Sequence, residues 1–197
     1  MLALLSRWGG RLVDRFGARL PLVVGPAIVA VGFLLLSLPG TGGSYWVTFF
    51  PPMLVLGLGM SITVAPLTTT VLNSVAQHQT GVASGINNSV AQVASLLLIA
   101  VLGTVGIASL DRSLDRHLAS SEASTEVHEI ADTARRGFVM PTMPPGTSEQ
   151  TQRAAHAVIA DSFLETLRHV MFIAAALSLA SAGAAALTIR PSTVTRK

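Results

Sequence analysis

The sequence predicts an all-α, multi-pass membrane protein with four complete transmembrane helices and a truncated helix at its N-terminus. Half of the 197 residues are hydrophobic and only 12% are charged, whereas soluble domains average about 25% charged residues. The apolar residues come in blocks, and four blocks reach the length of about 20 residues that a transmembrane helix needs. So few charges cannot cover a surface that faces water, and membrane lipids are therefore the expected surroundings.

The four predicted spans contain no Asp, Glu, Lys or Arg, and their one ionisable residue is His169, at an end of the last span. They cover residues 20–38, 46–72, 82–110 and 169–189. Helices are required because lipid offers no hydrogen-bond partner to backbone amides and carbonyls. Residues 1–8 resemble the last turns of a helix that begins upstream, which gives the truncated fifth helix. The whole chain, 1–197, is thus expected to be one transmembrane portion, with residues 111–168 as a long outer loop.

The distribution of basic residues predicts the orientation. Those outside the outer loop flank the first and last spans: Arg7, Arg11, Arg15, Arg19, Arg190, Arg196 and Lys197. Cytoplasmic segments are enriched in Lys and Arg, and four crossings return the chain to one side, so both ends are predicted to be cytoplasmic. Tyr45 and Trp46 lie where an interfacial belt of aromatic residues is expected. The net charge of +3 forms no single basic stripe, so nucleic acid is not an expected partner.

The outer loop carries helical patterns of its own. Leu110, Leu114 and Leu118 recur every four residues among charged neighbours, which predicts a helix that leaves the membrane with one apolar stripe. Residues 122–136 are polar and are expected to be helical or mobile. The prolines and the glycine of residues 141–146 break any helix, and the pattern from residue 151 onward predicts another helix that leads into the last span.

The turn before the first span carries an ordered set of residues. Gly10 and Gly17 allow a tight turn between two helices, and Asp14 can accept hydrogen bonds at a neighbouring helix N-terminus, where negative charge is favoured. Arg15 and Arg19 can pair with acids or with helix C-termini. An ordinary cytoplasmic loop would need only the arginines, so the two glycines and the aspartate favour a functional loop.

This turn resembles the signature loop of the major facilitator superfamily, Gly-x-x-x-Asp-Arg-x-Gly-x-Arg. In that family the loop joins the second and third helices of a six-helix half and gates the cytoplasmic side. The residues carried over are Gly10, Asp14, Arg15, Gly17 and Arg19. Ala18 stands where the family pattern has its second basic residue. The resemblance implies that the four spans form part of a major facilitator fold.

The second span contains residues that suit close helix packing. Gly57 and Gly59 permit near approach of a second helix. Pro66 frees one backbone carbonyl, which the hydroxyl groups of nearby threonines can satisfy. Pro66 is therefore a candidate either for helix packing or for lining a transport path.

The third span places small and polar residues on one helical face: Gly81, Gly85, Asn88 and Gln92. Polar side chains inside a membrane face protein or a water-filled cavity rather than lipid. Two interpretations remain open at this point. The face lines a transport path through Asn88 and Gln92, or it makes hydrogen-bonded contacts between helices.

The same stretch resembles the C-terminal half of the fourteen-helix drug:proton antiporters, although Ala91 replaces a basic residue that is usual there. The resemblance implies a portion of a larger transporter in the cell membrane that exports small amphipathic compounds against proton entry by alternating access. Its partners would be a missing N-terminal half, the substrate and protons. Because the spans contain no acid, the proton-coupling residue is expected in that missing half. The alternative is a membrane-packing or regulatory subunit without transport activity of its own.

The sequence contains no complete motif of the enzyme classes considered. His128 and Glu129 begin a sequence like a zinc-protease motif, but Asp132 replaces the second histidine. Gly57 and Gly59 follow no strand and lack the third glycine of a dinucleotide fingerprint. Cysteine is absent, which excludes thiolate metal sites. We therefore expect no enzymatic activity, no cofactor and no metal site.

Overall fold

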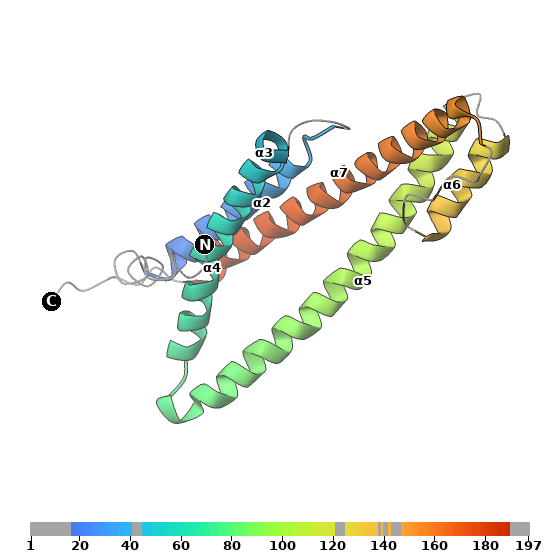
Figure 1. The fold of residues 1–197 in the computed structure, drawn as a ribbon. Coiled ribbons are helices and arrows are strands. Elements are labelled where there is room, and N and C mark those ends of the chain that lie inside the picture. Colours follow the sequence, from blue (N-terminus) through green and yellow to red (C-terminus); the bar gives the residue numbers. More distant parts are fainter. Residues whose placement is uncertain are drawn as a thin grey trace. The chain divides into compact units, whose positions relative to one another are not determined.

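The computed structural model describes residues 17–40, 45–120, 125–137, 139, 142 and 147–189. Its elements are α2 (Arg19–Leu36), α3 (Tyr45–Thr48), α4 (Phe50–Asn73), the 3₁₀ turn η1 (Gln77–Gln79), α5 (Thr80–Ser120), α6 (Thr125–Gly137) and α7 (Glu149–Thr188). The described residues contain no strand (Figure 1). The chain divides into two compact units. The first unit holds residues 17–39, 45–97 and 171–189, and the second holds residue 40 and residues 98–170.

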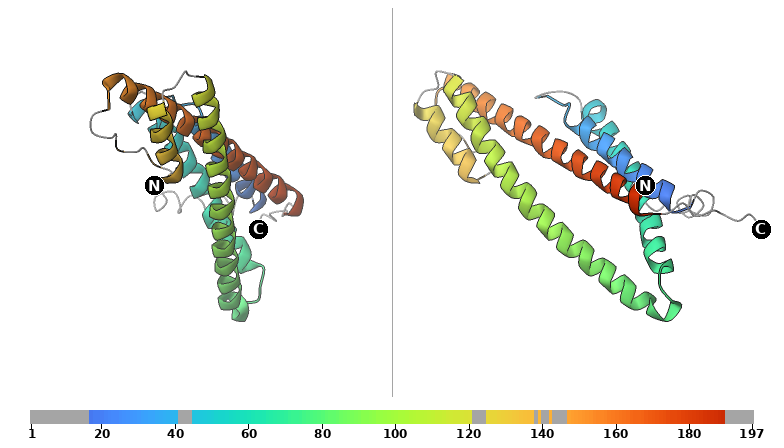
Figure 2. Two further views of the ribbon diagram at one scale, coloured as in Figure 1. Left: turned by 90° about the vertical axis from the view of Figure 1, so that its right-hand side faces the viewer. Right: turned by 180° about the vertical axis from the view of Figure 1, so that it is seen from behind.

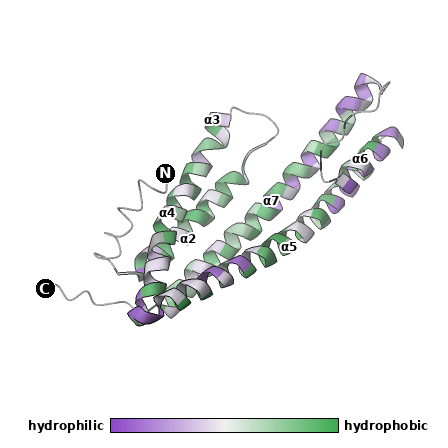
Figure 3. Cartoon of the chain, turned by 60° about the horizontal axis from the view of Figure 1, so that its bottom comes forward, coloured by the Kyte–Doolittle hydropathy of each residue, from purple (hydrophilic) through white to green (hydrophobic). Residues whose placement is uncertain are grey.

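Within the described part of the chain, four helical segments are long and apolar enough to cross a membrane, as the sequence predicted. They are Arg19–Leu36, Tyr45–Asn73, Gln77–Ala119 and Glu149–Thr188. Figure 3 shows that α2 and α4 are mostly hydrophobic, whereas hydrophilic residues gather on α6 and on the adjoining ends of α5 and α7. The all-α, multi-pass membrane fold is thereby confirmed. The boundaries of the membrane-spanning part of each helix stay a prediction.

In the first unit, α2 and α4 pack at very close range because glycines lie between them. A Cβ atom added to Gly59 would lie 2.7 Å from Val29 Cγ2 and 2.8 Å from the Val29 backbone nitrogen. A Cβ atom on Gly25 would fall on Thr63 Oγ1, which donates a hydrogen bond to the Gly59 carbonyl at 2.8 Å. Gly32 approaches Leu56 in the same way. Small residues that let two backbones approach are the usual basis of helix association in membranes.

The helix that covers the second predicted span is interrupted near its beginning. The four-residue helix α3 ends at Thr48, and α4 starts at Phe50 with prolines in its first turn. Proline suits a helix start because its missing N–H group would have no partner there. The rings of Tyr45 and Trp46 meet edge to face with their centroids 6.0 Å apart. The centroids of the Trp46 and Phe50 rings are 5.3 Å apart. These rings form a small aromatic cluster where the interfacial belt was predicted.

The second unit has a hydrophobic core of its own, drawn from three helices. The leucine stripe of α5 predicted from the sequence is part of it, with Leu114 fully buried. Val127 and Ile130 of α6 and Ile159 of α7 complete its centre. The sequence left residues 122–136 as helical or mobile. The structure describes this segment from residue 125, where α6 begins, and the apolar residues of α6 are spaced to bury one face against this core.

Ion pairs surround this core in the second unit. Arg135 of α6 pairs with Asp115 of α5 and lies 3.5 Å from Asp111. The hydrogen bond from Arg135 to Asp115 raises the pKa of the guanidinium above its ordinary value. Arg116 of α5 pairs with Glu165 of α7 at 2.6 Å. The charged residues of this segment thus join its helices to one another around an apolar centre.

Candidate functional site

The predicted gating loop is described only from Gly17 onward. Gly10, Asp14 and Arg15 lie outside the described residues. Gly17 is buried and has a φ of 73°, the left-handed region that glycine adopts without steric cost. This conformation lies directly before α2, as expected for a tight turn that leads into a span.

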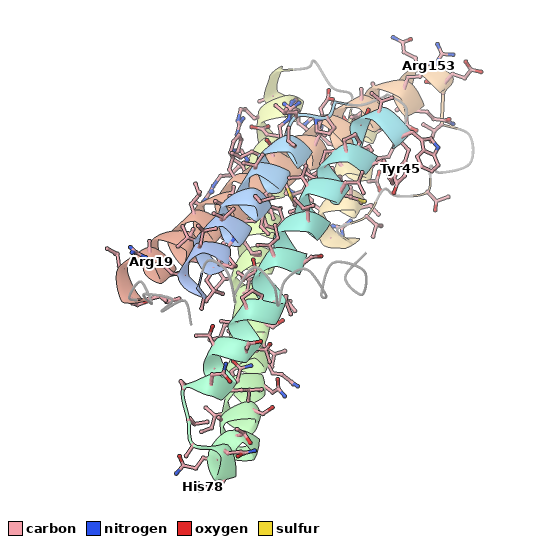
Figure 4. All side chains as sticks on the ribbon, turned by 90° about the vertical axis from the view of Figure 1, so that its left-hand side faces the viewer. Arg19, Tyr45, His78 and Arg153 are labelled. Atoms are coloured by element: carbon pink, nitrogen blue, oxygen red, sulfur yellow. The ribbon has the colours of Figure 1, made fainter. Side chains whose placement is uncertain are left out.

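Arg19 makes a long-range contact at the start of α2. Its Nη2 atom donates a hydrogen bond to the backbone carbonyl of Ala186, 2.8 Å away and 167 positions later in the chain. Ala186 lies in the last turn of α7, which ends at Thr188. Both residues belong to the first unit, and Figure 4 shows Arg19 beside the end of α7. A cation at a helix C-terminus interacts favourably with the helix dipole.

The small and polar face of α5 is open over its whole predicted length. Gly81, Gly85, Asn88 and Gln92 are all exposed. A Cβ atom added to Gly81 or Gly85 would meet nothing within 4 Å. The close approach that these glycines permit is therefore not used by any residue that the structure describes.

Pro66 has a different environment from that face. Its side chain is fully buried in α4, which continues through the proline. Thr70 donates a hydrogen bond to the Pro66 carbonyl at 2.7 Å, and Thr68 donates to the Val64 carbonyl at 3.1 Å. Pro66 thus lies in a packed helix, whereas the four residues of the α5 face are exposed.

A groove lies beside the α5 face, between the end of α4 and the beginning of α5. Its volume is about 630 Å³. The residues that line it are Val71, Ser74, Val75, Gln79, Val82, Ala83, Ile86, Asn87 and Val90. The polar residue that α5 contributes to the groove is Asn87, the neighbour of the exposed Asn88. All of the lining residues belong to the first unit.

Several residues of the first unit were not singled out from the sequence. Thr63 fills the space above Gly25, and the Ala186 carbonyl accepts from Arg19. Asn87 is one position away from the predicted face. Ala83 and Asn87 lie four residues apart on α5 and therefore share one side of the helix. The sequence indicates a helix C-terminus as one possible partner of Arg19, but it does not indicate that the end of α7 provides that partner.

The sequence resembling a zinc-protease motif lies on the surface of α6. His128, Glu129 and Asp132 are exposed on that helix. Among the residues that the structure describes, no group of three His, Cys, Asp or Glu side chains could hold a metal ion. A solvated helix face accounts for these three residues.

Comparison with known proteins gives the family. The sequence model described as Major Facilitator Superfamily matches residues 1–99, about half of the chain. The chain is 29% identical to the multidrug resistance protein Stp of Mycobacterium tuberculosis over 181 residues, which is 89% of this chain and 33% of Stp. It is 29% identical over 115 residues to the quinolone resistance protein NorB of Staphylococcus aureus, covering 53% of this chain and 23% of NorB.

A third relative is the puromycin resistance protein pur8 of Streptomyces alboniger, 30% identical over 118 residues, or 59% of this chain and 24% of pur8. The chain thus spans about a third or less of the length of the curated relatives it matches. No solved structure matches it. The family model matches residues 1–99, and four of the described helices are long and apolar enough to span a membrane. The chain therefore belongs to the Major Facilitator Superfamily, whose members are transporters rather than enzymes.

Proposed function

We propose that this chain is a portion of a larger transporter that exports small amphipathic drugs across the cell membrane by proton-coupled alternating access. Three relatives from different bacteria have names that refer to drug resistance. The chain covers 33% of the length of Stp, so the complete activity requires more protein than these four spans. The partner is a further set of helices that supplies the other half of the transport path.

The observation that carries the proposal is the open polar face of α5. Asn88 and Gln92 are exposed on a helix whose neighbouring residues are apolar enough to cross a membrane. An uncovered amide side chain at membrane depth is costly, so such groups face protein or water rather than lipid. Further helices that cover this face, or a water-filled path beside it, remove the cost.

Alternating access needs a gate, and the loop before α2 is our candidate. Gly17 supplies the turn, and Arg19 fixes the start of α2 against the end of α7. In the proposed cycle, Asp14 and Arg15 contact the other half of the transporter while the cytoplasmic side is closed. Opening separates those contacts as the halves rock about the central site.

Proton coupling requires a titratable group, and the one ionisable residue of the predicted spans is His169, at an end of the fourth span. The predicted spans contain no Asp or Glu. We therefore assign the coupling carboxylate to the N-terminal half of the complete transporter. In the cell membrane, both ends of this chain would lie on the cytoplasmic side, in accord with the excess of Arg and Lys around the first and last spans.

The test is an efflux assay in a drug-sensitive host with three proteins. The first is this 197-residue chain, the second is a version extended at its N-terminus to a full set of helices, and the third is the extended version with Asp14→Asn. Export by the second protein only, with the third impaired at equal protein level, supports the proposal. A fully extended protein that inserts normally and exports nothing contradicts it, and favours the packing or regulatory subunit.

A further inference from the structure

We propose that the groove between the end of α4 and the beginning of α5 is a binding site for a small, uncharged amphipathic molecule, with the Asn87 side chain as its hydrogen-bonding group. The proposal deepens the transport function given above, and it rests on that function only for the statement that the bound molecule is an export substrate. The site itself rests on the geometry of residues 71–90, all of which the structure describes and which belong to the first unit.

The groove is bounded by two helices that a short connection joins. α4 ends at Asn73, the turn η1 covers Gln77–Gln79, and α5 begins at Thr80. The two helices diverge from this turn (Figure 1, Figure 2), and residues of the turn region belong to the lining. The volume of about 630 Å³ falls within the range of about 300–1,000 Å³ that is typical of pockets for drug-sized ligands.

The lining has the composition of a site for an amphipathic ligand without charge. Both walls are mainly aliphatic, with Val71 and Val75 on α4 and with Val82, Ile86 and Val90 on α5. No residue in the lining that the structure describes is ionisable. A charged ligand would therefore lose hydration without gaining a countercharge. Pockets for neutral small molecules, by contrast, combine apolar walls with a few polar groups.

Two of the polar side chains in the lining are available to a ligand. The Ser74 hydroxyl donates to the Val71 carbonyl at 2.7 Å, so its hydrogen is already used within α4. The side-chain amides of Gln79 and Asn87 have no hydrogen-bond partner among the residues that the structure describes. Each amide offers an acceptor oxygen and two donor hydrogens. A ligand with a hydrogen-bonding head would satisfy groups that are otherwise left to water.

Asn87 is the better placed of these two amides. It is half-buried, whereas Gln79 and the neighbouring Asn88 are exposed. Asn87 lies four residues after Ala83 and three before Val90, so these three residues share one side of α5. The small side chain of Ala83 leaves room beside Asn87 in the direction of the turn. The head of a ligand at Asn87 would thus have aliphatic surface next to it.

The position of the groove suits the uptake of a molecule for export. In the proposed orientation, the turn between α4 and α5 lies on the cytoplasmic side together with both ends of the chain. A ligand of this groove would enter from that side, which is where an exporter takes up its substrate. Its apolar part would lie along the valines of the two walls, and its head would lie at Asn87.

The test uses the absence of cysteine from this chain, which makes any introduced cysteine its only thiol. Ala83→Cys reports on the groove, and Ala184→Cys is the matched control, an exposed alanine of α7 outside the lining. The rate of maleimide labelling of the 197-residue chain is measured in lipid vesicles. The probes are decanamide, an uncharged amphipathic amide, and decanesulfonate, which has the same chain length and a permanent negative charge.

Decanamide is expected to slow the labelling of Ala83→Cys by about fourfold at three times its dissociation constant, and to leave Ala184→Cys unchanged. Decanesulfonate should protect less at the same membrane-bound concentration. Unchanged labelling of Ala83→Cys, as expected if membrane lipid fills the groove, would overturn the site. Equal protection at both cysteines would overturn it as well, and equal protection by the two probes would overturn the selection against charge.

The role of Asn87 is tested in the Ala83→Cys chain. Asn87→Leu should weaken decanamide binding by about two- to tenfold, the worth of one hydrogen bond. Asn73→Leu, which removes an exposed amide of α4 outside the lining, should leave the binding unchanged. Equal binding by the two variants would overturn the assignment of Asn87.

The second arm measures drug export by the N-terminally extended version. Ala83→Trp fills the groove with a large side chain, and Ala184→Trp places the same side chain on α7 outside it. Lower export by Ala83→Trp than by Ala184→Trp at equal protein level supports a site on the transport path, whereas equal export overturns that role. If the extended version without substitutions exports nothing, the transport function fails, while the labelling of the 197-residue chain still decides the binding site.

Discussion

The closest helix packing in the chain gives its sharpest stability prediction. Gly59→Ala adds one methyl group between α2 and α4. That carbon would lie 2.7 Å from Val29 Cγ2, 2.8 Å from the Val29 nitrogen and 2.9 Å from the Gly25 carbonyl oxygen. Optimal carbon contacts lie at about 3.5–4.0 Å, so the helices must separate by about 1 Å. Because two of the three atoms are backbone, no rotamer change relieves the clash, and overpacking of this kind costs about 1–3 kcal/mol.

The control is Gly183→Ala on α7, where a Cβ atom would meet nothing within 4 Å. Both substitutions gain about 0.5–1 kcal/mol from replacing a helical glycine, so this gain cancels when the two variants are compared. The remaining difference of about 1–3 kcal/mol is the cost of separating the helices.

The assay is equilibrium unfolding of the purified chain in mixed detergent micelles. The change is followed by the fluorescence of Trp46, which lies next to α4 in the short helix α3. Trp8→Phe in all samples leaves Trp46 as the only tryptophan. Gly59→Ala that unfolds at the same midpoint as Gly183→Ala would refute the close packing of α2 on α4.

Three further predictions concern the gate, the second unit and the open face. Asp14→Asn in the N-terminally extended transporter should lower export about two- to fivefold, the worth of one charge at a helix terminus, with normal insertion; unchanged efflux at equal protein level would remove the gating role. Leu114→Ala should destabilise the second unit by about 2–5 kcal/mol, because it leaves a cavity in a fully buried core. Limited proteolysis compared with exposed Leu97→Ala measures this effect, and equal resistance would count against the core. Asn88→Leu should change the drug profile of the extended transporter if Asn88 lines the path, and lower its thermal stability if Asn88 packs against another helix. A variant unaltered in both would contradict both interpretations.

The spans and the second-unit core were predictable because each depends on local pattern. Twenty apolar residues have to be helical at membrane depth whatever else the chain does. The spacing of Leu110, Leu114 and Leu118 places all three on one face before any partner is known, and that face is buried in the core. The interruption at Phe49 was less visible, because its cause is a pair of prolines inside an otherwise uniform apolar run.

The site was predictable only in part, because its contacts depend on which helix faces meet. The sequence indicates that Arg19 needs an acid or a helix C-terminus, but it does not say which helix ends nearby. Likewise, Gly59 indicates close approach of a second helix without naming Gly25 and Val29 as its neighbours. Asn87 and Asn88 are adjacent, so a rotation of about 100° about the helix axis decides which one reaches the groove.

In the first unit, α2 and α4 are closely packed, whereas α5 is largely exposed. This difference bears on where a transport path would run. α2 is locked to α4 by glycines and contacts the last turn of α7 through Arg19. Residues 91–97 of α5, by contrast, are exposed throughout, as are Gly81, Gly85 and Asn88 before them. A path between two moving halves needs a surface that does not already pack against helices of its own half. The facing sides of α2 and α4 pack against each other, whereas the α5 face carries polar groups and is exposed. On this argument the substrate would pass on the α5 side of the first unit, and the Gly59 and Arg19 contacts would hold the frame from which that face is presented.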